Sequence, residues 1–323
     1  GWTFGSPSVL MMFYRASGEL QSELTEMDEC MPHYYKITNG HGQGAETIMR
    51  AEADFMHACF ADAQIMLERA YAQIDGNGQE NMALCCDFLA WRLSLCTSFT
   101  PRESFEQRRE ALLQQHNVAW LNILQSSCAY YYALLGLPEK IPAVFRDHQL
   151  ASIHFLAPGK PMMELIENQV YLAQGEYAKV IGHSEALLGM CEAMHYALVA
   201  LHIRLQTAAA YEMLGKRETA DELLISALAA AEPDALYLPF VENYRYLKTA
   251  LTRGAGAKFA AFVRTVTPLG EDFVRRCGEK RAEGSRPAAL AGLTERESAI
   301  AALVAKRLSN REIAEQLFLS REA

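Results

Sequence analysis

The feature that most constrains this sequence is an internal repeat of about 40 residues. In each copy an amphipathic helix ends near a small residue, and a second amphipathic helix starts two or three residues later. The residues that mark the turns are Gly18, Ala58, Ser98, Gly136, Gly175, Gly215 and Gly254. Small residues let two helices approach closely, and each pair leaves an apolar face that only a neighbouring pair covers. The sequence therefore predicts an all-α solenoid of about seven helical hairpins.

The repeat is clearest between residues 205 and 233. Tyr211 and Gly215 lie at the end of the first predicted helix, Ala220 and Leu224 lie on the second, and Pro233 follows it. This pattern resembles the tetratricopeptide repeat, although its spacing is longer than is usual in that family. Armadillo-like or HEAT-like geometry is the alternative at this period. Either resemblance implies a helical-repeat solenoid, which we place at residues 1–277.

The segment 293–323 carries two helix-start signals in quick succession. Thr294 is followed three residues later by Glu297, and Ser309 by Glu312. In each pair the hydroxyl accepts a hydrogen bond from a first-turn N–H, and the carboxylate reaches back to the cap's own N–H, so we predict all four residues as helix caps. Ser320 resembles the cap of a third helix. The layout predicts a helix-turn-helix, with a capped helical hairpin that ends the solenoid as the alternative.

The same segment resembles the LuxR-type DNA-binding domain. The resemblance rests on Leu293-Thr294-x-Arg296-Glu297, on Ala305, and on Ser309-Asn310-x-Glu312-Ile313-Ala314-x-x-Leu317-x-Leu319-Ser320. Arg307 stands where the family usually has glycine. In the family the recognition helix follows the serine equivalent to Ser320, which implies that most base-reading residues lie past Ala323.

Three polar residues near the predicted helix starts are candidates for contact with the DNA backbone, because helix N-termini and side-chain donors bind phosphate. These residues are Asn310, Arg311 and Ser320. The resemblance implies DNA as the partner of the complete domain. Residues 278–292, which precede the segment, mix Gly, Pro, Ser and charge without apolar periodicity and are predicted to form a flexible linker.

Composition narrows the class of protein. The net charge of −9 is unfavourable for binding nucleic acid, and it suits an acidic body whose basic recognition helix is absent. The eight cysteines form no C-x-x-C pair and the nine histidines no H-E-x-x-H motif, so we expect buried thiols and no metal site. No apolar run approaches the ~18–20 residues of a membrane span, and the start lacks signal-peptide features. We therefore predict a cytoplasmic protein with no membrane contact.

Aromatic residues on the first predicted helix of successive hairpins are candidates for effector binding. In a solenoid these helices line the concave face, where aromatic rings stack on sugars or peptides, and packing between repeats is the alternative. The candidates are Trp91, Trp120, Tyr131, Tyr132 and Tyr171. The glycine-rich stretch from Thr38 to Gly44 is predicted as a turn between helical pairs, with an anion cradle as the alternative.

The chain contains no P-loop motif, no isolated carboxylate pair in an apolar setting and no nucleophile motif. We therefore expect no enzymatic activity, no catalytic residues and no cofactor in this chain. A solenoid joined by a linker to a LuxR-type domain resembles the MalT-like regulators. That resemblance implies an upstream nucleotide-binding module that uses ATP, a solenoid that binds an effector, and self-association.

The prediction for function is a transcription regulator whose solenoid senses a small molecule or a protein and controls the C-terminal helix-turn-helix. The alternative is a tetratricopeptide-like scaffold that binds other proteins and takes no small-molecule ligand. The two differ in an observable way, since only the regulator binds a small effector or DNA.

Overall fold

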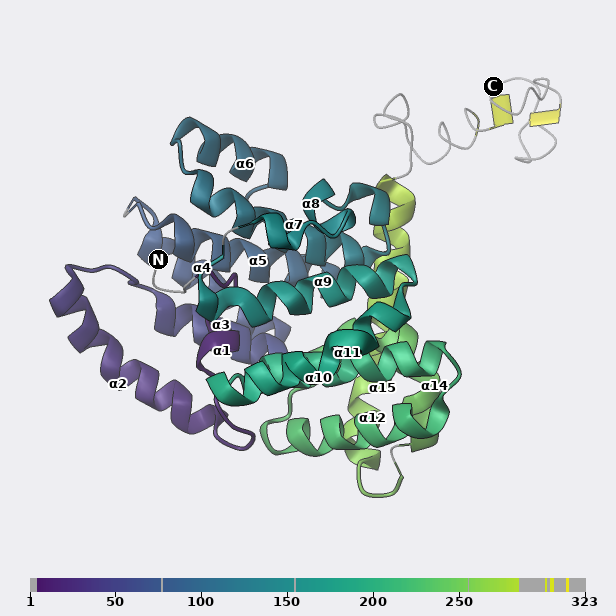
Figure 1. Cartoon of the computed structure of the whole chain (residues 1–323). Helices are drawn as coiled ribbons and strands as arrows, with labels where there is room; N and C mark the ends of the chain where they lie inside the picture. Colours follow the sequence, from purple (N-terminus) through teal and green to yellow (C-terminus); the bar gives the residue numbers. More distant parts are fainter. Residues whose placement is uncertain are drawn as a thin grey trace. The chain divides into compact units, whose positions relative to one another are not determined.

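The computed structural model describes residues 5–76, 78–153, 155–254, 256–284, 300, 303–304 and 312–313. All regular secondary structure in these ranges is helical, which confirms the predicted all-α class (Figure 1). The chain divides into two compact units, Gly1–Gly278 and Glu279–Ala323. None of the described helices combines the length and hydropathy that crossing a bilayer requires.

The first unit contains nearly all the described helices. Its N-terminal half consists of α1 (Leu10–Phe13), α2 (Leu20–Thr38), α3 (Ala45–Met56), α4 (Phe60–Ile74), α5 (Glu80–Cys96), α6 (Phe105–Gln114), α7 (Val118–Leu135) and α8 (Ala143–Arg146). The helices that follow are α9 (Lys160–Gln174), α10 (Tyr177–Met194), α11 (Ala197–Met213), α12 (Arg217–Ala231), α13 (Leu238–Glu242), α14 (Tyr244–Gly254) and α15 (Ala260–Gly284). Short 3₁₀ turns at Pro138–Lys140, Leu150–Ser152, Ala157–Gly159 and Glu232–Asp234 connect some of them.

Consecutive helices pack against each other as pairs, notably α3 with α4, α10 with α11, and α11 with α12. Gly175 ends α9 in the left-handed region, with φ of 79°. Its N–H donates to the Leu172 carbonyl at 3.2 Å, and the next N–H donates to the Tyr171 carbonyl at 2.9 Å. This capping satisfies carbonyls that the helix end leaves without partners and turns the chain sharply into α10.

The predicted turn residues lie at or near helix ends. Ala58 and Gly215 separate α3 from α4 and α11 from α12, with left-handed φ of 59° and 75°. Ser98 lies between α5 and α6, whereas Gly254 is the last residue of α14. The glycine-rich stretch from Thr38 to Gly44 connects α2 to α3.

The core is built around two helices that are buried on nearly all sides and consist mostly of apolar residues. Of α5, every residue from Leu84 to Cys96 is buried, and α11 is buried along most of its length. A helix that is apolar all round is stable only when other helices surround it. On α11 the small residues Ala208, Ala209 and Ala210 are fully buried, which brings α12 close.

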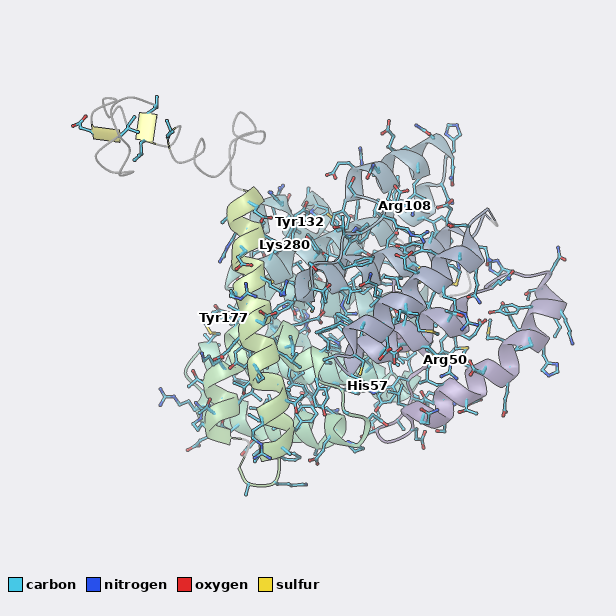
Figure 2. All side chains as sticks on the ribbon, turned by 180° about the vertical axis from the view of Figure 1, so that it is seen from behind. Arg50, His57, Arg108, Tyr132, Tyr177 and Lys280 are labelled. Atoms are coloured by element: carbon cyan, nitrogen blue, oxygen red, sulfur yellow. The ribbon has the colours of Figure 1, made fainter. Side chains whose placement is uncertain are left out.

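Contacts also join helices that are far apart in the sequence. The Tyr237 N–H donates to the Met56 carbonyl at 2.9 Å, and His57 (Figure 2) approaches the Asp234 carbonyl with Nε2 at 2.9 Å. The Ala197 N–H at the start of α11 donates to the Tyr14 carbonyl at 3.1 Å. The N-terminal helices are therefore bonded directly to α11 and to the segment around α13.

The predicted C-terminal regions are described only in part. Residues 278–284 of the predicted linker continue α15, and residues 285–292 lie outside the described residues. In the predicted helix-turn-helix, Glu312 and the buried Ile313 are helical. The other predicted caps and DNA contacts lie outside the described residues, namely Thr294, Glu297, Ser309, Asn310, Arg311 and Ser320. The helix-turn-helix stays a prediction.

In helix α15, Gly270 lies directly against the side chain of Tyr244. A Cβ added at Gly270 would lie 2.8 Å from the Cβ of Tyr244 and closer still to the tyrosine ring. A Cβ added at Gly278, on the same helix, would meet nothing within 4 Å. Two glycines on one helix thus differ in the space beside them.

We expect Gly270→Ala to lower the free energy of unfolding by about 1–3 kcal/mol, because the added methyl group overpacks the contact with Tyr244. The control, Gly278→Ala, adds the same group in open space. It is expected to raise the free energy of unfolding by up to about 1 kcal/mol, because alanine has a higher helix propensity than glycine. Urea unfolding followed by circular dichroism measures both. Changes of the same sign in the two variants would contradict the packing argument.

Candidate ligand-binding groove

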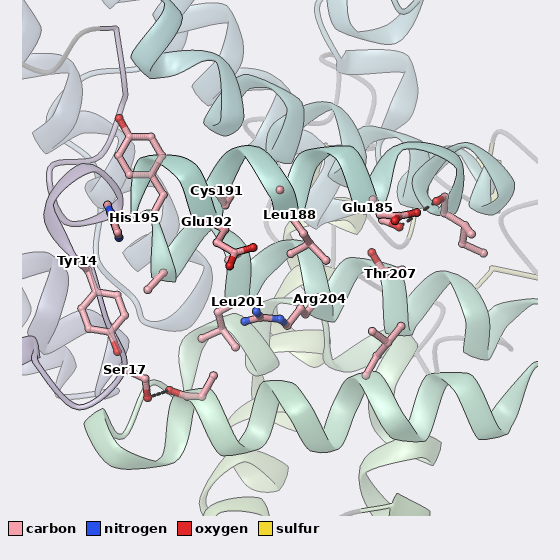
Figure 3. Close-up of a pocket in the computed structure, with 18 of the residues that line it drawn as sticks. Tyr14, Ser17, Glu185, Leu188, Cys191, Glu192, His195, Leu201, Arg204 and Thr207 are labelled. Atoms are coloured by element: carbon pink, nitrogen blue, oxygen red, sulfur yellow. Dashed lines mark hydrogen bonds between the residues drawn. The ribbon is translucent and has the colours of Figure 1, made fainter.

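A groove of about 1050 Å³ lies between α10 and α12, and α11 forms its floor (Figure 3). Both outer helices pack against α11, so the space between them is open above the middle helix. The lining residues come from the stretches 181–192 of α10, 195–211 in and before α11, 219–230 of α12, and 14–17 before α2. We call this space the α10–α12 groove.

The wall formed by α10 is a stripe that repeats every seven residues. Gly182 and Gly189 lie two turns apart, as do Glu185 and Glu192, so each pair falls on the same face. A Cβ at either glycine would meet nothing within 4 Å, which leaves this wall open to a ligand backbone. The two glutamates are exposed. The wall therefore offers small residues and negative charge along one line.

The floor carries one cation, Arg204 on α11, set among Ala200, Leu201 and Thr207. Its side chain is partly buried and points into the groove toward the α10 wall, where Glu192 lies opposite (Figure 3). Within the described part of the chain, Arg204 forms no hydrogen bond or ion pair. A partly desolvated guanidinium without a partner is unfavourable, so an anionic group in the groove would gain a strong, charge-assisted contact.

The other partly buried arginines of the described chain have polar partners. Three form ion pairs and one donates to a backbone carbonyl: Arg50 with Asp28, Arg108 with Asp87, Arg276 with Asp272, and Arg245 with the Leu134 carbonyl. Arg204 is the exception among them. Among these partly buried arginines, Arg204 is therefore the one whose charge is not already used by a described residue.

One end of the groove is closed by the segment Tyr14–Gly18, which we call the strap. The Ser17 hydroxyl donates to the Ala230 carbonyl on α12 at 2.6 Å, and the Tyr14 hydroxyl donates to Asp234 Oδ2 at 2.6 Å. The Gly18 N–H donates to the same carboxylate oxygen at 2.5 Å. Burial, and then the nearby Asp234 carboxylate, raise the pKa of the Tyr14 phenol, so it stays a neutral donor. The strap is thus tied to the end of α12.

The thiol in the groove is held in its protonated form. Cys191 is buried beneath the α10 wall, and burial raises its pKa to about 12, against the weaker opposing effect of Arg204. A thiol with that pKa stays protonated at neutral pH. Among the described residues, no group of three or more His, Cys, Asp or Glu side chains is placed to hold a metal ion.

Four of the five aromatic residues predicted to bind an effector meet around Phe105. The ring centroids of Trp91 and Phe105 are 3.9 Å apart, and those of Tyr131 and Tyr132 lie 5.5 and 5.8 Å from Phe105. Trp120 packs against the same cluster. Trp91 is buried and its indole N–H donates to the Glu103 carbonyl at 3.0 Å, whereas Tyr132 is partly buried (Figure 2).

A hollow of about 170 Å³ lies beside Phe105 and is smaller than the ~300–1,000 Å³ usual for ligand pockets. Tyr171 lies elsewhere, stacked on His148 with centroids 4.1 Å apart. None of the five aromatic residues lines the α10–α12 groove. Their role in binding an effector stays a prediction, and the groove offers a different set of residues.

Sequence reasoning did not single out Arg204, Glu185 or Glu192. A signal for them exists, because Arg204 is the only Asp, Glu, Lys or Arg residue between Ala197 and Ala210. The glutamates are seven residues apart on the preceding helix. Each feature alone is typical of a solvated helix face, and only the packing of α10 on α11 brings them to one groove.

No protein-family model, no curated protein and no solved structure matches this chain. The features that bear on function are therefore the α10–α12 groove and the sequence of residues 293–323.

Proposed function

We propose that this chain is the effector-sensing part of a transcription regulator. Its helical hairpins, about seven in a solenoid, bind an effector in the α10–α12 groove, and the occupied state controls a LuxR-type helix-turn-helix at residues 293–323. The observation that carries the proposal is the partly buried Arg204, which bonds to no described residue and lies in a groove of about 1050 Å³.

Two further features support a binding role for the groove. Its volume is at the upper end of the ~300–1,000 Å³ usual for ligand sites. Its lining combines apolar side chains such as Leu188 and Leu201 with a few charged and hydroxyl groups, the mixture that fixes a ligand's orientation. Support for the regulatory role comes from the two capping pairs and the LuxR-type sequence at residues 293–323.

The proposal is tested by a thermal-shift screen of the chain against sugars, nucleotides, amino acids, short peptides and aromatic metabolites. A ligand present at 100 times its Kd stabilises the folded state by about 2.7 kcal/mol, which raises the melting temperature by a few degrees. The matched variant is Gly189→Tyr, whose new side chain fills the groove from a position with free space around it. We expect a ligand that raises the melting temperature of the natural chain and does not raise that of Gly189→Tyr.

The regulatory half is read out with the same ligand. We expect it to change the retention of duplex DNA by the chain at low salt, where backbone contacts are strongest. A hit that shifts Gly189→Tyr as much as the natural chain would place the ligand outside the groove. A screen without hits, together with a partner protein whose binding Gly189→Tyr abolishes, would favour the interaction scaffold instead.

A further inference from the structure

We infer that the ligand of the α10–α12 groove is an extended peptide segment of about six residues that carries one acidic and one basic side chain. The inference rests on the proposed function and names the chemical class of its effector. It is carried by the length of the groove, by the order of charges along it, and by the small residues of its wall.

The length of the groove suits a peptide better than a compact metabolite. Its α10 wall runs from Ile181 to Glu192 and its lining continues to His195, which at 1.5 Å per residue is about 21 Å. An extended chain spans about 3.3–3.6 Å per residue, so about six residues fill that length.

The charges along the groove call for both an anion and a cation. Arg204 on the floor is partly buried and bonds to no described residue, so an acidic group placed beside it would gain a charge-assisted contact. Glu185 and Glu192 on the wall are exposed and also have no ion pair with a described residue, so a purely acidic ligand would be repelled by them. In Figure 3 Arg204 lies opposite Glu192, and Glu185 lies farther along the same wall. A peptide with both signs of charge satisfies the floor and the wall together.

The spacing of these groups sets the spacing in the peptide. Glu185 lies seven residues before Glu192, which is about 10 Å along the helix. In an extended chain this distance corresponds to about three residues. We therefore place the acidic side chain on Arg204 and the basic side chain at Glu185, three or four positions away.

The wall that carries these two glutamates also admits a peptide backbone. Gly182 and Gly189 present no side chain, and the space where a Cβ would lie is empty to 4 Å. A backbone approaches such a surface closely, and side chains alternate to either side of it. The hydroxyls of Tyr211 and Thr219 also line the groove and are able to bond to peptide amides.

The probe is a library of N-acetylated, C-amidated hexapeptides with one Asp and one Lys fixed three or four positions apart, and the remaining positions drawn from Ala, Leu, Ser and Thr. Peptides retained by the full chain are labelled and measured by fluorescence anisotropy.

We expect Arg204→Gln to weaken binding by about tenfold or more, because it removes a charge-assisted contact. Glu185→Gln should weaken the binding of peptides that carry Lys and leave unchanged the binding of analogues in which Gln replaces that Lys. Arg217→Gln is the matched control, since this exposed arginine lies on α12 outside the groove lining.

Three outcomes would overturn the inference. Retained peptides that bind Arg204→Gln as tightly as the natural chain would place them elsewhere. An empty library screen together with a non-peptide metabolite whose thermal shift requires Arg204 would exclude the peptide class and leave the proposed function standing. An empty library screen, no metabolite hit and no partner blocked by Gly189→Tyr would remove both the inference and the proposed function. Arg204→Lys, which keeps the charge without the planar fork, should retain part of the affinity.

Discussion

Replacing Arg92 with methionine is expected to lower the free energy of unfolding by about 3–5 kcal/mol, because it leaves an uncompensated carboxylate in the core. Arg92 on α5 and Glu242 on α13 are each 1% exposed. Their side chains form a two-pronged ion pair, with Nε to Oε1 at 2.8 Å and Nη2 to Oε2 at 3.1 Å.

Among the described residues, Arg92 is the one cation that forms an ion pair with Glu242. The Tyr130 hydroxyl donates to Glu242 Oε2 at 2.8 Å, and the Arg92 guanidinium lies 4.8 Å from the Phe55 ring centroid. The aromatic ring stabilises the guanidinium through a cation–π contact. In Arg92→Met the carboxylate keeps only a neutral hydroxyl donor, so it must be protonated or hydrated at a cost to the fold.

Equilibrium urea unfolding measures the loss, and a double variant separates the ion pair from simple packing. Arg92→Met with Glu242→Gln removes both charges while the amide oxygen still accepts from Tyr130, so this double variant is expected to lose less than Arg92→Met alone. The surface control is Lys248→Gln, which breaks the exposed pair with Glu271 and should cost under about 1 kcal/mol. An Arg92→Met variant no less stable than this control would contradict the prediction.

The second large effect is a change in acid sensitivity on replacing His202 with glutamine. His202 lies on α11, is fully buried, and neither ring nitrogen bonds to a described residue. Burial, and then the positive charge of Arg92, lower its pKa to about 3. In the unfolded chain the pKa is about 6.5. Between these values only the unfolded state binds the proton, so His202 costs about 1.4 kcal/mol of stability per pH unit below about pH 6.5.

Unfolding free energies of the natural chain and His202→Gln, measured from pH 7.5 to pH 5, test this. We expect the natural chain to lose stability more steeply below pH 6.5, with a difference between the two proteins of about 2 kcal/mol by pH 5. Burial raises the pKa of Glu52 to about 7. This shift makes the folded state more stable as the pH falls, opposite to the effect of His202, and it is present in both proteins. The exposed His33 gives the control His33→Gln. Parallel pH profiles for the natural chain and His202→Gln would refute a buried neutral histidine.

The parts of the fold that the sequence predicts are those with local causes. The all-α class follows from apolar residues at helical spacing, and the turns at Gly175 and Gly215 follow from residues that adopt a left-handed backbone. The segment from Thr38 to Gly44 is a connection between helices for the same reason. These features depend on a few neighbouring residues, which is why they are visible without the structure.

The groove depends on contacts that no local pattern contains. In the sequence, Arg204 is an ordinary charged residue of a helix. In the structure it faces Glu192 of α10 across the groove (Figure 3), and it forms no ion pair with a described residue. Trp91 is predicted to face an effector, but the tilted ring of Phe105 on α6 packs against it and its indole N–H is already bonded. Whether an aromatic ring is available therefore depends on which later helix covers it, and that is a property of tertiary packing.

The strap gives the groove a connection to the start of the chain. Asp234 accepts hydrogen bonds from Tyr14, Gly18 and Leu20, which lie more than 200 positions earlier in the sequence. Because the strap is also the end wall of the groove, its attachment and the occupancy of the groove are linked equilibria. If attachment of the strap raises the affinity for a ligand by some factor, binding of that ligand shifts the equilibrium toward the attached strap by the same factor. A substitution that loosens the strap, such as Asp234→Ala, is therefore expected to weaken the binding of such a ligand, because it removes the hydrogen bonds from Tyr14 and Gly18.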